Sequence, residues 1–201
     1  MQQHTVTEYF SKLSQLMLDI EVTNLQGADL PLDQGTDEAV QMILEVGAAS
    51  GKVMLVGNGG SSAVVSHVQN DLCKAVGSRA LVFTEQPLLT ALANDHGYGC
   101  VFERPIELWA EPDDLLLTVS SSGQSESIIR AIEAAREKGC QIVTLSGFSP
   151  ENASRKMGDL NFYVSSDAYG YVETAHAALC HYMTDKARAA KQTPSTSEVH
   201  V

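Results

Sequence analysis

Two short segments of this chain combine serine, glycine and small polar residues in a way that suits anion binding. The first, Gly57-Asn58-Gly59-Gly60-Ser61-Ser62, follows the apolar run 52–56 and precedes a helical pattern. Glycines let the backbone turn sharply and approach a ligand, and a helix N-terminus offers unpaired amides with partial positive charge. Taken alone, this loop is explained about equally well as a tight structural turn and as a ligand-binding loop.

The second segment favours the ligand-binding interpretation. Ser120, Ser121, Ser122 and Ser125 surround Gly123 after another apolar run, again just before a helical pattern. Helix capping accounts for one of these serines but not for four. Hydroxyls and amides together can surround phosphate oxygens without adding charge. Neither loop has the G-x-G-x-x-G or Walker A pattern, so the two loops predict a phosphate site rather than a nucleotide site.

Two groups of titratable residues lie on predicted helices. His67 and Asp71 are four residues apart and share one helix face. Glu173 and His181 are two turns apart on broadly the same side of the last helix, whereas His176 is rotated away from His181. A lone histidine on a helix is more often structural or solvated than catalytic. Because spacing alone cannot bring two helices together, the residues leave a joint site and two separate surface groups equally open.

The elements that must position these residues alternate between short apolar strands and amphipathic helices. Strands are predicted at 52–56, 79–83, 114–119, 140–145 and 160–164, with helices at 62–76, 88–94, 126–138 and 170–189. Residues 102–109 are predicted to be either a short helix or irregular. This alternation predicts an α/β fold with a five-stranded parallel sheet covered on both faces. Such sheets bind ligands at the carboxyl ends of their strands, where both loops fall. Two further helices are predicted at 5–24 and from 36 or 37 to 46.

The chain length and composition limit the domain organisation. With 201 residues, the chain is expected to form one core domain at 51–190, preceded by N-terminal helices within 1–50 and followed by a disordered tail at 191–201. The net charge of −12 and the lack of a basic stripe argue against binding to nucleic acid or anionic membranes. No apolar run reaches the length of a membrane span, and the N-terminus lacks a signal-peptide layout, so we expect a cytoplasmic protein.

The four cysteines do not suggest a metal or redox motif. Cys73, Cys100, Cys140 and Cys180 contain no C-x-x-C pair, and each has apolar neighbours in the sequence. Buried free thiols are therefore expected at all four positions.

The two loops in this order, together with His67, Asn94-Asp95 and His181, resemble phosphoheptose isomerases of the SIS-domain (sugar isomerase) superfamily. These enzymes interconvert sedoheptulose 7-phosphate and D-glycero-D-manno-heptose 7-phosphate, and the resemblance runs from the N-terminal helices to about Lys186. It implies a flavodoxin-like sheet and a homotetramer with sites between subunits, where the helices of 1–50 take part in contacts. It also implies heptose biosynthesis, with lipopolysaccharide, capsule or a secondary metabolite downstream.

The resemblance also implies roles for individual residues. The loop residues Asn58, Gly59, Gly60, Ser61, Ser120, Ser121, Ser122, Gln124 and Ser125, together with Asp95, would bind the sugar phosphate. Of these, the serines would hold the phosphate, and Asn58, Asp95 and Gln124 would lie near the sugar. His67, Asp71, Glu173 and His181 would bind zinc, and the last three would also be catalytic. Asp71 stands where the family has a glutamate base, Glu173 where it has glutamine, and Gly170 where it has aspartate.

The implied reaction is an aldose–ketose isomerisation through an enediol, in which Asp71 or Glu173 moves the proton between carbons and His181 shuttles hydroxyl protons. Two alternatives remain. One is a non-catalytic SIS protein of the kind that associates with the bacterial replication initiator, although that kind lacks the histidine present here as His181. The other is an isomerase of a different sugar phosphate, for which the departures at Asp71, Glu173 and Gly170 leave room.

Overall fold

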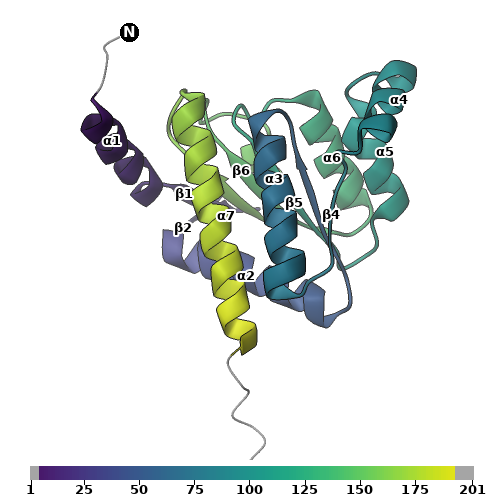
Figure 1. The fold of residues 1–201 in the computed structure, drawn as a ribbon, viewed down its shortest axis with the longest axis horizontal. Coiled ribbons are helices and arrows are strands. Elements are labelled where there is room, and N and C mark those ends of the chain that lie inside the picture. Colours follow the sequence, from purple (N-terminus) through teal and green to yellow (C-terminus); the bar gives the residue numbers. More distant parts are fainter. Residues whose placement is uncertain (1–4, 193–201) are drawn as a thin grey trace, which may run out of the picture.

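The computed structural model describes residues 5–192, which form one sheet with helices on both faces (Figure 1). The parallel strands are β3 (Val53–Gly57), β4 (Ala80–Val82), β5 (Leu115–Ser120), β6 (Gln141–Ser146) and β7 (Leu160–Tyr163). Their spatial order is β4-β3-β5-β6-β7. This is the 2-1-3-4-5 order of flavodoxin-like folds, and all five predicted strands are confirmed.

A short hairpin extends the sheet to seven strands, and the sequence analysis missed it. Strand β1 (Glu21–Asn24) pairs antiparallel with β2 (Asp29–Leu30) and with β7, where Val22 lies opposite Phe162. Helix α1 (Val6–Leu18) ends before this hairpin, so the single predicted helix over 5–24 is wrong beyond Leu18. The turn is stabilised because the Asn24 side chain accepts hydrogen bonds from the amides of Gln26 and Ala28.

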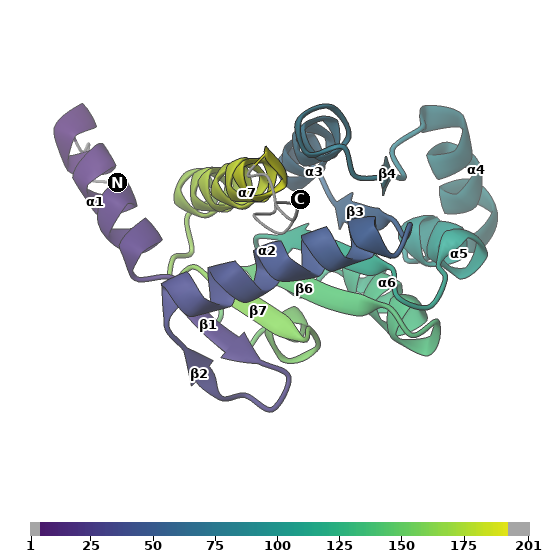
Figure 2. The same ribbon diagram turned by 90° about the horizontal axis from the view of Figure 1, so that it is seen from below.

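Successive strand residues point to opposite faces and build two apolar cores. Leu55, Leu117 and Val143 belong to one core, which also contains side chains of α2 (Leu32–Ala48), α3 (Gly60–Asp71) and α7 (Tyr169–Gln192). Met54, Leu116 and Ile142 belong to the other core, which contains side chains of α5 (Cys100–Trp109) and α6 (Glu126–Glu137). Helix α4 (Gln86–His96) packs outside α5 and has no buried residue (Figure 2).

Helices α3 and α7 lie side by side on one face of the sheet (Figure 1). Helix α3 continues into a π-helical turn, Leu72–Val76, and Gly77 ends it with a φ of 71°. That turn also packs on α7. The pairing of α3 with α7 is important because it brings together the two groups of titratable residues from the sequence.

Three of the four cysteines are buried free thiols, as predicted. Cys100, Cys140 and Cys180 are buried, but Cys73 is exposed because it lies on the outer side of the π-helical turn. Burial raises the pKa of Cys140 to about 11 and that of Cys180 to about 12, so both thiols stay protonated at neutral pH.

The predicted disordered tail begins too early, because Lys191 and Gln192 are the last residues of α7. The rest of that tail, 193–201, lies outside the described residues. No helix within residues 5–192 is long and apolar enough to cross a membrane.

Candidate active site

The first Ser/Gly loop is a sharp turn between β3 and the N-terminus of α3. Gly57 ends the strand, and a Cβ there would lie 2.8 Å from the backbone of Ser61. Gly59 precedes the helix with a φ of 55°, a conformation that favours glycine. These two glycines allow the chain to reverse direction and expose the first amides of α3, which is the geometry of an anion site.

The second loop follows β5 and is arranged around Gly123. The φ of this glycine is 60°, and a Cβ there would collide with the side chain of Asn152. Ser120 Oγ accepts a hydrogen bond of 3.2 Å from the Gly123 amide, so this hydroxyl helps to form the turn. Ser125 is the N-cap of α6, yet its side chain makes no capping hydrogen bond. Ser121 Oγ is buried and has no hydrogen-bond partner among residues 5–192.

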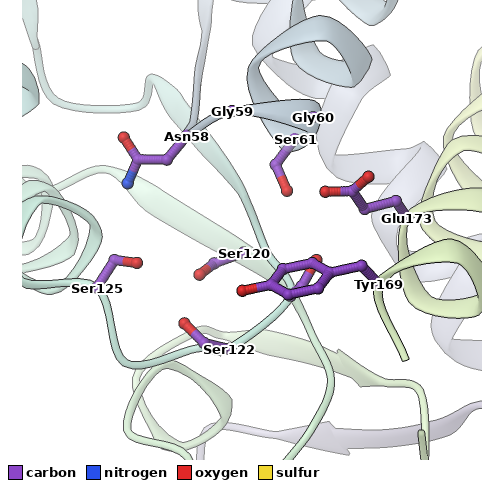
Figure 3. A pocket seen from close by; sticks show the side chains of 10 residues that line it. Asn58, Gly59, Gly60, Ser61, Ser120, Ser122, Ser125, Tyr169 and Glu173 are labelled. Atoms are coloured by element: carbon purple, nitrogen blue, oxygen red, sulfur yellow. The ribbon is translucent and has the colours of Figure 1, made fainter. Parts of the chain in front are cut away.

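The two loops form one pocket because β3 and β5 are neighbours in the sheet, with Gly57 opposite Val119. The cavity has a volume of about 230 Å³. It is lined by Asn58, Gly59, Gly60, Ser61, Ser120, Ser121, Ser122, Ser125, Tyr169 and Glu173 (Figure 3). The structure thus gathers eight of the predicted sugar-phosphate residues at one place. Tyr169 was missed by the sequence analysis, since no spacing marks a residue that enters a pocket from the start of a distant helix.

Two other predicted substrate residues are not part of this lining. Asp95 is exposed on the last turn of α4, where its Oδ1 accepts a hydrogen bond of 2.7 Å from Asn94. Gln124 is exposed beside the second loop. Their assignment to the sugar end of the substrate therefore stays a prediction.

His67, Asp71 and His181 come together where α3 contacts α7. Asp71 Oδ2 lies 3.5 Å from His67 Nε2 and 3.3 Å from His181 Nδ1. The two imidazole rings are 4.9 Å apart and meet edge to face. The histidines are about half exposed, at 58% and 53%, whereas the Asp71 side chain is 21% exposed. The question that residue spacing left open is thus answered in favour of a joint group.

This group has suitable chemistry for a divalent metal ion. Each of the three residues offers one ligand atom, and these atoms lie within 4.8 Å of one another. Ligands at about 2.05 Å from a tetrahedral zinc ion are about 3.3–3.4 Å apart, close to the two distances at Asp71. Two imidazoles and one carboxylate are also a common zinc donor set.

Glu173, the fourth predicted metal ligand, lies outside this group. Its carboxylate lies against the first turn of α3, where a Cβ added at Gly60 would collide with it, and it lines the Ser/Gly pocket (Figure 3). A carboxylate at this position lies near the unpaired amides of a helix N-terminus. Its position places an acid directly beside the space where the loops would hold a phosphorylated ligand.

His176 is structural rather than part of the site, in keeping with its rotation away from His181. It is fully buried, and its Nε2 lies 3.1 Å from the carbonyl oxygen of Ser146. Burial lowers the pKa of His176 to about 4, although the contact with the Ser146 carbonyl opposes this effect. The ring is therefore neutral at physiological pH.

Known proteins share the fold and up to about a third of the residues over the matched regions. The family model of the SIS domain matches residues 8–147. Phosphoheptose isomerase from Syntrophotalea carbinolica is 34% identical over 165 residues, covering 79% of this chain and 83% of that protein. The phosphoheptose isomerase from Geobacter sp. (strain M21) is 31% identical over 180 residues, covering 86% of this chain and 91% of that protein. The structure of phosphoheptose isomerase from Neisseria gonorrhoeae matches with a TM-score of 0.79 and 25% identity, covering 90% and 97% of the two chains. This chain therefore belongs to the SIS-domain family of phosphoheptose isomerases.

Proposed function

We propose that this chain is an aldose–ketose isomerase that interconverts sedoheptulose 7-phosphate and D-glycero-D-manno-heptose 7-phosphate in heptose biosynthesis. The observation that carries this proposal is the position of Asp71 between two histidines on the same helix pair, α3 and α7, that borders the Ser/Gly pocket. The family membership supports the same reaction. A phosphate-binding pocket next to acid–base side chains is the arrangement that a sugar-phosphate isomerase needs.

The Ser/Gly pocket binds the phosphate through neutral groups. The amides at the start of α3 and the hydroxyls of the second loop supply the donors. Ser121 Oγ can donate as well, because no group in the described part of the chain forms a hydrogen bond with it. The net charge of the chain makes such a local arrangement necessary, since the protein as a whole repels phosphorylated metabolites. Binding of the phosphate positions the reacting carbons.

Glu173 and His181 then carry out the proton transfers at C1 and C2 of the sugar. Glu173 is the acid that lines the pocket, so we assign to it the removal of the proton from C1 of the ketose and its return to C2. His181 moves protons between the two oxygens of the enediol. Asp71 contacts both His181 and His67, and it holds the imidazoles in place rather than reaching the carbon itself.

Zinc is the cofactor that we propose for this site. His67, Asp71 and His181 would hold it, with Glu173 as a fourth ligand if its side chain turns toward them. When bound, such an ion polarises the sugar carbonyl and stabilises the negative charge that develops on its oxygen. A cytoplasmic homotetramer is the corresponding proposal for assembly, and the exposed apolar side chains Val6 and Phe10 of α1 support contacts between subunits.

The proposal is tested by following hydrogen exchange in deuterated water with sedoheptulose 7-phosphate, before and after chelation and after adding zinc. Deuterium at C2 of the aldose product is expected, with loss of exchange on chelation and recovery with zinc. His181→Ala should abolish exchange while calorimetry still detects binding of the sugar phosphate. Binding without exchange in the wild type would instead support a non-catalytic SIS protein, or an isomerase of another sugar phosphate that a substrate panel would identify.

A further inference from the structure

We propose that Tyr98 is a positioning residue for this reaction, which fixes the side-chain amide of Asn58 in the orientation that the sugar hydroxyls require. This inference rests on the proposed function, because it concerns how the same pocket selects its substrate. Tyr98 does not line the pocket and was not singled out by the sequence. Asn58 does line the pocket, so Tyr98 acts through it.

The contact is part of a chain of two hydrogen bonds. The Tyr98 hydroxyl donates to Asn58 Oδ1 over 2.8 Å, and Asn58 Nδ2 donates to Ser127 Oγ over 3.0 Å. Ser127 is buried in the first turn of α6 and gives the amide a rigid anchor. Both ends of the Asn58 amide thus have a hydroxyl partner, one on the α4–α5 loop and one on α6, which together hold the side chain in one rotamer. One N–H and one lone pair of the amide remain available for a ligand.

The backbone around Tyr98 is shaped for this contact. Gly97 ends α4 with a φ of 85°, which a residue with a side chain adopts only at a cost. Gly99 lies so close to α6 that a Cβ there would be 2.6 Å from Glu126 Oε1. Gly97 and Gly99 therefore allow the backbone to place Tyr98 close to the first Ser/Gly loop.

The hydrogen bond between Tyr98 and Asn58 also connects α4 and the loop after it, which have few buried contacts, to the pocket. Helix α4 has no buried residue and packs mainly on α5. Tyr98 as a residue is 51% exposed, so its burial contributes little to stability. The hydroxyl is the part of Tyr98 with a defined partner, and the partner is a pocket residue. This combination is typical of a residue that positions a binding group rather than one that stabilises the core.

The test compares wild type with Tyr98→Phe, which removes only the hydroxyl. Loss of one hydrogen bond predicts a KM for sedoheptulose 7-phosphate raised about 5- to 10-fold, with kcat changed less than about twofold. Because the proposal assigns the Asn58 amide to the sugar hydroxyls, the inhibition constant of inorganic phosphate should stay the same. In an Asn58→Ala background, Tyr98→Phe should have no further effect on KM.

Tyr171→Phe is the matched control. The Tyr171 ring stacks on Tyr9, and its hydroxyl has no hydrogen bond within residues 5–192, so KM should not change. An unchanged KM in Tyr98→Phe would overturn the proposal, as would an equal rise in the Asn58→Ala background. A lower melting temperature with unchanged KM would assign Tyr98 a purely structural role and overturn it too.

Failure of the proposed function can be told apart from failure of this inference. If the wild type binds sedoheptulose 7-phosphate without turnover, the same comparison is made on calorimetric Kd values. Independently of any substrate, a crystal structure of Tyr98→Phe should show the Asn58 side chain in another rotamer or in two conformers. An amide that keeps its orientation and its bond to Ser127 would overturn the proposal whatever the reaction.

Discussion

Asp71 Oδ2 lies 3.3 Å from Nδ1 of His181, across the contact between α3 and α7. The same oxygen lies 3.5 Å from Nε2 of His67, one helical turn earlier on α3. One carboxylate oxygen is therefore shared by two imidazoles from two helices. An aspartate is long enough for this position because α3 and α7 pack closely, so the shorter side chain suits the role of a ligand better than that of a base reaching the sugar.

The first prediction concerns the Asp71 carboxylate. Asp71→Asn replaces a charged oxygen donor by a neutral amide, and it should lower zinc affinity by at least about 100-fold, because even residues that only support metal ligands cost 10- to 100-fold. Zinc content after dialysis against a zinc buffer, measured by elemental analysis, checks this. Asp185→Asn, an exposed change on α7, is the control and should retain zinc. Full zinc occupancy in Asp71→Asn would place the metal elsewhere.

The second prediction concerns Glu173 as the base. Glu173→Gln should lower kcat about 10²- to 10⁴-fold, the usual contribution of general acid–base catalysis. It should also strengthen the binding of inorganic phosphate, because the Glu173 carboxylate lines the same pocket and its negative charge repels the anion. Steady-state kinetics with phosphate as a competitive inhibitor measures both effects.

The control for Glu173→Gln is Glu133→Gln on the exposed side of α6, which should change neither value. If Glu173→Gln keeps its kcat while Asp71→Asn loses it in the presence of saturating zinc, then Asp71 is the base. Weaker phosphate binding in Glu173→Gln would show that the carboxylate helps to form the pocket instead.

The five parallel strands and their covering helices could be predicted because each strand is a short apolar run ending at a Ser/Gly loop or a turn. The β1–β2 hairpin could not. Ile20 and Val22 continue the apolar spacing of α1, and only pairing with β7 shows that Val22 belongs to a strand. A four-residue strand beside a helix gives too few residues to distinguish a period of two from one of 3.6.

The pocket could also be predicted, since both loops carry their chemistry in consecutive residues. Residue spacing alone could not predict the contacts between distant segments, although the family resemblance implied that Asp71 and His181 share a site. Asp71 and His181 meet only because α3 packs on α7, and Tyr98 meets Asn58 only because α4 and α5 bring it back beside β3. Spacing along one helix indicates which residues share a face, but not which other helix that face will contact. The family resemblance assigned Glu173 to the metal group, whereas its side chain lies against Gly60.

The third prediction concerns the buried hydroxyl of Ser121, which lacks a hydrogen-bond partner in the described chain. Such a group costs stability when the pocket is empty and gains a partner when phosphate binds. Ser121→Ala should therefore leave the melting temperature equal or slightly higher, while KM rises about 10-fold. Thermal denaturation and initial-rate kinetics check the two parts separately.

Ser120→Ala is the contrasting variant, because Ser120 Oγ accepts a hydrogen bond from Gly123 in the turn itself. This change should lower the melting temperature as well as weaken substrate binding. If Ser121→Ala is destabilised as much as Ser120→Ala, the Ser121 hydroxyl has a structural partner and is not reserved for the ligand.

The fourth prediction concerns His176 and the dependence of stability on pH. Burial lowers its pKa in the folded protein from 6.5 to about 4, so the unfolded chain binds a proton at His176 more readily than the folded one. The contribution of a neutral His176 is complete above pH 6.5 and is lost as the pH falls toward 4, by roughly 3 kcal/mol over the whole range. Between pH 7.5 and 5, urea unfolding at constant protein concentration should show a decrease of about 2 kcal/mol from this group. In His176→Gln the decrease in the free energy of unfolding should be smaller by that amount, whatever the stability of the variant at pH 7.5.

His96→Gln, at an exposed position, is the control and should show the same pH dependence as the wild type. An identical pH dependence in His176→Gln and wild type would mean that the buried ring gains a proton without unfolding.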